Sequence, residues 1–128
     1  MNVMEILAEV DLKYPNDVDI SQKWSWITTL EKMLLDECLM THELSEEERI
    51  RAEEIRRLKD VGRDYKPVAQ PPYHEVYVHY ISMQIALVNV DTEQYENEST
   101  LYNNALLTYK KWFNRTHRSR ERNLKWRF

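Results

Sequence analysis

Residues 91–116 read DTEQYENESTLYNNALLTYKKWFNRT. Large apolar side chains recur in this stretch three, four or seven residues apart, at Tyr95, Tyr102, Leu106, Tyr109 and Phe113. Such spacing places them along one face of an α-helix. Asp91 is a suitable amino-terminal cap, with Gln94 at the capping-box position three residues later. The stretch therefore predicts a long amphipathic helix whose aromatic face packs on the rest of the chain.

The preceding segment, residues 73–90, contains no Gly or Pro and is apolar on most of its circumference. Its two apolar rows have helical spacing and leave a narrow polar strip of Glu75, His79, Ser82 and Asn89. A helix of this kind belongs at the centre of a bundle. The break near Asn89 is weak, so the sequence leaves open whether 73–90 and 92–115 are two helices or one long bent helix.

Three helices are predicted in the amino-terminal half, over residues 3–13, about 22–42 and 45–60. Ser21 is the expected cap of the second helix, whose broad, mostly apolar face comprises Trp26, Leu30, Met33, Leu34, Glu37, Cys38 and Met40. A capping box of Ser45 and Glu48 starts the third helix, which has few apolar residues and is expected to be solvated and loosely docked. Residues 61–72 hold three of the four prolines and the only glycine, which predicts the main linker.

Composition favours an all-α fold. A chain of 128 residues fits one domain. One glycine and four prolines supply too few turn residues for a many-stranded sheet. We predict a small helical bundle over residues 1–116, with a long carboxy-terminal helical hairpin, followed by a basic, extended carboxy-terminal arm over residues 117–128.

Cysteine content and hydropathy bear on the compartment. Cys38 is the only cysteine, so no intrachain disulfide can form. The apolar runs fall far short of the roughly 20 residues of a membrane helix. We therefore expect a soluble protein that is made in the cytoplasm and makes no membrane contact.

The net charge of −4 conceals an asymmetry along the chain. Residues 1–109 have 10 Lys and Arg against 21 Asp and Glu, whereas residues 110–128 have 8 against 1. An acidic body of charge −11 thus precedes a basic tail of charge +7. The tail is either a solvated end or an arm that orders against an acidic protein surface or nucleic acid. Its candidate partner-binding residues are Arg115, Arg118, Arg120, Arg122, Lys125, Trp126, Arg127 and Phe128.

No catalytic or metal-binding pattern stands out. The four histidines are spread over three segments, and none forms a two-histidine helical pair with a third ligand. Glu75 and His79 lie four residues apart, a spacing at which a solvated ion pair is favoured over a metal site. Cys38 lies among leucines on a predicted helix, as expected of a buried, inert thiol. We expect no enzymatic activity, no metal and no cofactor.

The aromatic residues suit both a core and an interface. Rows of Tyr and Trp at helical spacing usually belong to the core, where each buried ring contributes about 1.5–3 kcal/mol. Amphipathic rings also anchor protein interfaces. The sequence therefore leaves open whether some of these rings contact a partner subunit, the candidates being Tyr95, Tyr102, Tyr109 and Trp112.

The aromatic and asparagine spacing of residues 71–116 resembles the carboxy-terminal signature of head–tail connector, or adaptor, proteins of long-tailed bacteriophages. The aromatic residues that carry it are Tyr73, Tyr77, Tyr80, Tyr95, Tyr102, Tyr109, Trp112 and Phe113. They are accompanied by Pro72, Glu96, Asn97, Leu101, Asn103, Ala105 and the run 114–116. The turn at 12–16 and the Trp26–Ile27 pair are also similar to that family. The sequence departs from it at Val90, where a glycine turn is typical.

The resemblance implies a structural protein of the virion, located at the head–tail interface after assembly in the host cytoplasm. It implies a ring of copies that docks on the portal protein after DNA packaging and extends the DNA channel. The ring would offer a surface to the next connector or tail-completion protein and make nonspecific contact with packaged DNA. Residues 115–128 correspond to the portal-docking arm.

The residues alone also admit another class of function. A small helical nucleic-acid-binding or regulatory protein could use the basic tail to contact phosphates. The acidic body weighs against this alternative, because a charge of −11 repels the same polyanion.

Overall fold

A computed structural model describes residues 1–118 of the chain, whose elements of secondary structure are all helices, with no β-strand among them. The prediction of an all-α fold is confirmed. The elements are α1 (Val3–Lys13), α2 (Ile20–Leu34), the π-helix η1 (Leu35–Leu39), α3 (Glu46–Arg57), α4 (Glu75–Val88) and α5 (Thr92–Thr116).

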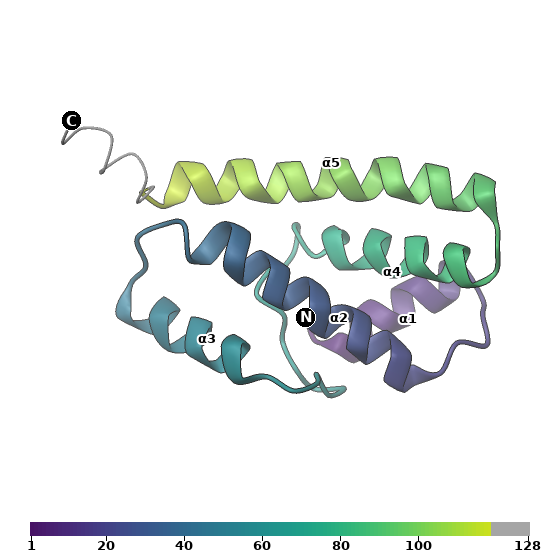
Figure 1. The fold of residues 1–128 in the computed structure, drawn as a ribbon, viewed down its shortest axis with the longest axis horizontal. Helices are drawn as coiled ribbons and strands as arrows, with labels where there is room; N and C mark the ends of the chain where they lie inside the picture. The colour runs from purple at the N-terminus through teal and green to yellow at the C-terminus, as the bar shows by residue number, and fades with distance from the viewer. Residues whose placement is uncertain (119–128) are drawn as a thin grey trace.

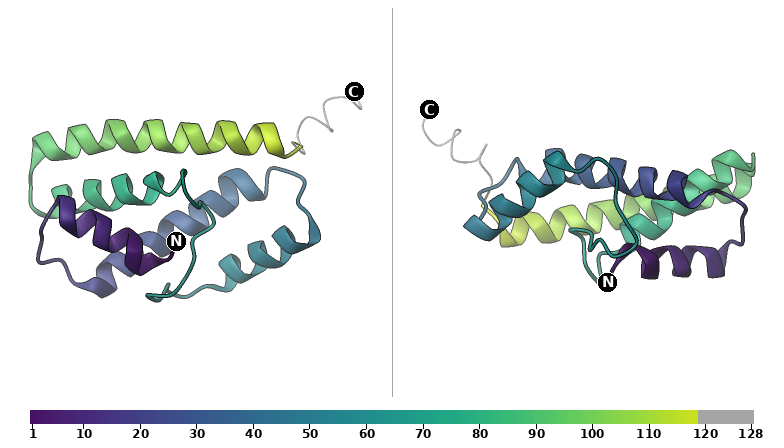
Figure 2. Two further views of the ribbon diagram at one scale, coloured as in Figure 1. Left: turned by 180° about the vertical axis from the view of Figure 1, so that it is seen from behind. Right: turned by 90° about the horizontal axis from the view of Figure 1, so that it is seen from below.

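The two carboxy-terminal helices form an antiparallel hairpin, and α1 and α2 pack against the shorter one (Figure 1). α4 lies against the amino-terminal half of α5 and also contacts α1 and α2. α3 packs on η1 and α2. Figure 2 shows that α5 extends along the whole length of the bundle, with its carboxyl end beyond α4. No helix of residues 1–118 combines the length and hydropathy needed to cross a membrane.

The first helix has the predicted bounds, Val3–Lys13. Asn2 caps it in a capping box with Glu5, because each side chain accepts a hydrogen bond from the other's backbone N–H. The apolar positions three and four residues apart are all buried, at Val3, Ile6, Leu7 and Val10. They hold α1 against α4.

The second helix differs from its prediction at both ends. Asp19, not Ser21, is the N-cap residue, and the Ser21 hydroxyl instead donates a 2.9 Å hydrogen bond to the Asp19 carboxylate. The α-helical part ends at Leu34, where η1 begins, and the N–H of Met40 reaches back five residues to the carbonyl of Leu35 at 2.9 Å. This wider turn inserts one residue into the helical ladder, a feature that single-residue propensities do not reveal.

The predicted apolar face of the second helix is partly wrong. Leu30, Leu34 and Cys38 are buried, but Glu37 is exposed and Glu31 is fully buried. A charged side chain enters the core only when its polar atoms are satisfied there, and Glu31 has partners from two distant segments, as described below.

The third helix begins at the predicted capping box of Ser45 and Glu48. It is not loosely docked, because Ala52 and Ile55 are buried in the core. These two apolar residues lie on a helix that contacts both η1 and α2.

The predicted linker lies in residues 58–74, here called the connecting segment, which is non-helical but packed. Val61 and Ala69 are buried. The N–H of Val61 donates to the Thr28 hydroxyl at 3.0 Å, and the N–H of Val3 donates to the carbonyl of Tyr65 at 2.9 Å. The connecting segment therefore contributes to the body of the molecule.

The carboxy-terminal pair consists of two separate helices, which settles the alternative left open by the sequence. Val90 turns the chain with φ of 53°, in the left-handed region where a glycine is usual. Asp91 caps α5 as predicted, accepting from the N–H of Gln94 at 3.1 Å. The predicted polar strip faces solvent only at its ends: Glu75 and Asn89 are exposed, but His79 and Ser82 are buried. Leu87 and Val88, by contrast, are exposed.

Candidate functional site

The predicted arm leaves the body at a cluster of rings on the last turns of α5. Phe113 is buried and stacks on His117, with ring centroids 3.9 Å apart and planes 3° from parallel. His42, from the loop after η1, meets the Phe113 ring edge-on at 4.9 Å. Residues 113–118, with their partners His42, Glu43 and Glu48, are called the arm base from here on.

Polar contacts complete the arm base. His42 Nε2 lies 2.7 Å from Asn114 Oδ1, and His42 Nδ1 lies 2.6 Å from the backbone carbonyl oxygen of Cys38. His117 Nε2 pairs with the Glu48 carboxylate at the start of α3. The contacts of Asn114 and His117 join the end of α5 to residues 72 and 69 positions away in sequence, so the exit of the chain has a defined position.

Glu48 illustrates the electrostatics of the arm base. Partial burial works against its charged form, but hydrogen bonds from the Ser45 backbone and the contact with His117 outweigh it and lower the pKa of the carboxyl. The Glu48 carboxylate therefore contributes stability that is present above its unfolded-state pKa and is lost as the pH falls through the lowered, folded-state pKa.

Only two of the predicted arm residues lie in the described part of the chain. Arg115 and Arg118 are both exposed. The backbone carbonyl of Arg118 accepts a 2.7 Å hydrogen bond from the N–H of Glu43. The Arg118 side chain lies outside the body. Six predicted arm residues lie outside residues 1–118: Arg120, Arg122, Lys125, Trp126, Arg127 and Phe128.

The eight signature aromatics are brought together inside one subunit. Tyr77, Tyr102, Tyr109 and Phe113 are buried, and Tyr73, Tyr80, Tyr95 and Trp112 are partly buried against the core. Tyr73 stacks on Trp112 with centroids 5.0 Å apart, and Tyr80 meets Tyr102 at 5.3 Å. These contacts hold α4 to α5 and so position the arm base at the end of the hairpin.

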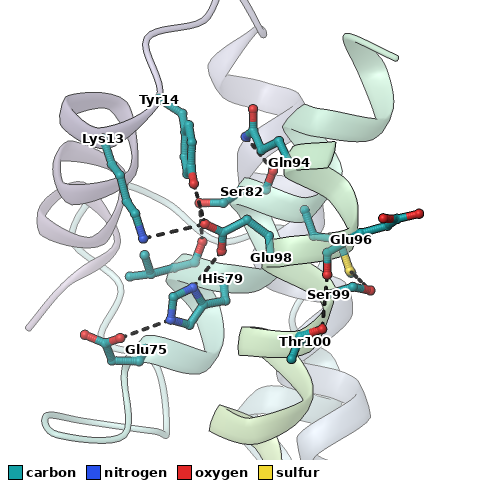
Figure 3. A network of polar contacts seen from close by, with 12 residues as sticks. Lys13, Tyr14, Glu75, His79, Ser82, Gln94, Glu96, Glu98, Ser99 and Thr100 are labelled. Atoms are coloured by element: carbon teal, nitrogen blue, oxygen red, sulfur yellow. Dashed lines mark hydrogen bonds and ion pairs between the residues drawn. The ribbon is translucent and has the colours of Figure 1, made fainter. Parts of the chain in front are cut away.

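A second polar network, which the sequence did not suggest, secures the other end of the hairpin (Figure 3). Glu98 of α5 is fully buried and accepts a 2.7 Å hydrogen bond from the Tyr14 hydroxyl. The other Glu98 oxygen, Oε2, lies 2.7 Å from His79 Nδ1. Lys13 Nζ lies 3.5 Å from Oε1, the oxygen that Tyr14 contacts. His79 Nε2 is 3.1 Å from Glu75, so the predicted contact between these two side chains is present.

Cys38 lies below a small surface pocket beside the arm base, lined also by Glu37, Thr41 and Lys110. Burial raises the pKa of its thiol to about 11, so the thiol stays protonated at neutral pH. Lys110 is paired with Glu37 at 3.0 Å. The prediction that the Cys38 thiol is buried is confirmed.

Comparison with known proteins returned no relative: no family model, no curated protein and no solved structure matches the chain.

Proposed function

We propose that the chain is a structural head–tail connector subunit of a long-tailed bacteriophage, which docks on the portal ring through its carboxy-terminal arm. The observation that carries the proposal is the arm base. It holds the start of the arm, whose residues 115–128 carry six Lys and Arg against one Glu, at one end of an acidic helical body, with Arg115 and Arg118 exposed to solvent. An arm that is anchored where it begins loses less conformational freedom on docking than a free tail.

The two ends of α5 support a subunit with two separate contact surfaces. At about 1.5 Å per residue, a helix of 25 residues separates them by about 38 Å. The turn opposite the arm base exposes three neighbouring apolar side chains, Leu87, Val88 and Val90. A connector that joins a portal on one side to another component on the other needs such a separation of surfaces.

The test is cosedimentation of the full chain with rings of the portal protein encoded in the same phage genome. We expect the full chain to travel with the rings and the triple variant R118A/R120A/R122A to stay at the top of the gradient. The matched control is R49A/K59A/K66A, which removes the same charge from exposed positions of the body and should still bind. Failure of the full chain to bind intact portal rings contradicts the proposal.

Duplex DNA distinguishes the nucleic-acid alternative. A tail that neutralises phosphates loses affinity for DNA steeply with salt, with a log–log slope of about −0.9 per phosphate contact. Tight DNA binding with that salt dependence, together with no binding to portal rings, would favour a nucleic-acid-binding protein.

A further inference from the structure

Three metal-ligating side chains converge where α1 packs near the start of α4. Glu9 comes from α1, His74 immediately precedes α4, and Glu75 is its first residue. Each offers one ligand atom, and these atoms all lie within 4.8 Å of one another. The Glu9 Oε2 and His74 Nε2 atoms are 3.3 Å apart.

The polar atoms of this cluster are incompletely satisfied. Glu9 Oε2 is buried and makes no hydrogen bond in the described part of the chain, where its partner is His74 Nε2 in the ion pair. The ion-pair partners of Glu9 and Glu75 within residues 1–118 are histidines alone, because Lys13, one turn beyond Glu9, is directed to Glu98 instead. A cation between these atoms would therefore compensate two carboxylate charges that no lysine or arginine of residues 1–118 neutralises.

One ligand of the cluster is held in place by a second layer of contacts. His79 Nε2 lies 3.1 Å from the Glu75 carboxylate, and His79 Nδ1 lies 2.7 Å from the buried Glu98 (Figure 3). Outer contacts of this kind orient metal ligands and raise affinity. They also leave the second Glu75 oxygen available to face His74 and Glu9.

We propose that Glu9, His74 and Glu75 form a binding site for a divalent transition-metal ion of the zinc type. One imidazole nitrogen and two carboxylate oxygens match the three-ligand sets that bind zinc and leave a further position for water. Calcium and magnesium prefer more oxygen ligands. The ion offsets the two glutamate charges and links α1 to the start of α4, two elements that already pack together.

Titration calorimetry of the full chain with ZnCl₂, without portal, tests the site. We expect saturable binding of one ion per chain and a rise of the melting temperature that follows saturation. Co²⁺ provides a direct readout, because its visible absorption reports nitrogen and oxygen ligands in a site with few waters.

Variants assign the binding to these residues. Glu9→Gln and His74→Gln are expected to weaken Zn²⁺ binding by at least about tenfold, with melting temperatures in metal-free buffer close to that of the parent. His117→Gln is the matched control, because His117 is also paired with a glutamate, and it should bind Zn²⁺ as the parent does. The proposal is overturned if the parent chain binds no Zn²⁺, or if both site variants bind it as tightly as the parent. Because portal is absent, neither result bears on the connector proposal.

Discussion

Glu31 lies at the centre of the bundle with its side chain fully buried. Its carboxylate accepts hydrogen bonds from the hydroxyls of Tyr65, at 2.6 Å, and Tyr77, and from the N–H of Val68 at 3.1 Å. Burial raises the pKa of this carboxyl despite those bonds. The stability it contributes is therefore complete below its unfolded-state pKa and is lost as the pH rises through the raised, folded-state pKa.

Removing one tyrosine hydroxyl tests the hydrogen bonds to Glu31. Tyr77→Phe deprives Glu31 of a donor and leaves the N–H of Ala69, which donates to the Tyr77 hydroxyl at 3.0 Å, without an acceptor. We expect a loss of about 1–3 kcal/mol in the free energy of unfolding, measured with urea. Tyr80→Phe is the matched control, since the Tyr80 hydroxyl makes no hydrogen bond within residues 1–118, and it should change stability by about 0.5 kcal/mol or less. Equal effects of the two changes would contradict the role given to Glu31.

Val90 is strained at the turn between α4 and α5. A β-branched residue with φ of 53° costs about 1–3 kcal/mol, and its side chain is 85% exposed and gains little from packing. Val90→Gly should raise the free energy of unfolding by about 1 kcal/mol, after the larger entropy of the unfolded glycine chain is included. The control Val88→Gly removes another exposed valine, from a helical position, and should lower stability. A destabilised Val90→Gly variant would show that the turn carries no such strain.

At the scale of elements, the hairpin of α4 and α5 is the frame to which the others attach. Its aromatic contacts run from Tyr80 and Tyr102 near the middle to Trp112 and Phe113 at the arm base. The wider turn of η1 directs the chain from α2 toward α3, so that His42 reaches Phe113. Elements distant in sequence thereby meet at the point where the chain leaves the body.

The docking of α3 gives a prediction at this scale. Ile55 is fully buried, whereas Ile50, on the same helix, is 58% exposed. Ile55→Ala should lower the free energy of unfolding by about 2–5 kcal/mol because it opens a cavity in the core. Ile50→Ala removes the same atoms from the surface and should have an effect of about 0.5 kcal/mol or less. If Ile55→Ala were also neutral in a urea titration, α3 would be loosely docked, as its sequence first suggested.

At the scale of the whole molecule, residues 117 and 118, the first two of the predicted arm, contact the folded body. His117 stacks on Phe113 and pairs with Glu48, and the carbonyl of Arg118 is bonded to Glu43, so both residues belong to the folded body. The excess of basic residues begins earlier, at Lys110 within α5, so the first part of the basic tail belongs to the helical body.

Two truncations test whether residues 117 and 118 stabilise the folded body. A chain ending at Arg118 should unfold within about 0.5 kcal/mol of the full chain. A chain ending at Thr116 loses the ring stacking and the ion pair of His117, and we expect it to be less stable by about 1–2 kcal/mol. Urea titrations of the three chains measure the difference. Equal stabilities of the two truncated chains would place His117 outside the body.

Much of the helical content could be predicted because it depends on local signals. The bounds of α1, the Ser45 capping box and the Asp91 cap follow from apolar periodicity and from side chains that bond to backbone three residues away. The grouping of Glu9, His74 and Glu75 could not be predicted, because Glu9 lies 65 residues before His74 and meets it only through the packing of α1 on α4.

By itself, the sequence determined the all-α class, the amphipathic helix of residues 92–116 and the contrast between an acidic body and a basic tail. These properties depend on composition and on spacing along one helix. Tertiary structure alone decided that Glu31 and Glu98 are buried, that the connecting segment is packed, and that His42 and His117 anchor the end of α5. The reason is physical: a buried polar group is stable only with partners in place, and here those partners come from distant parts of the chain.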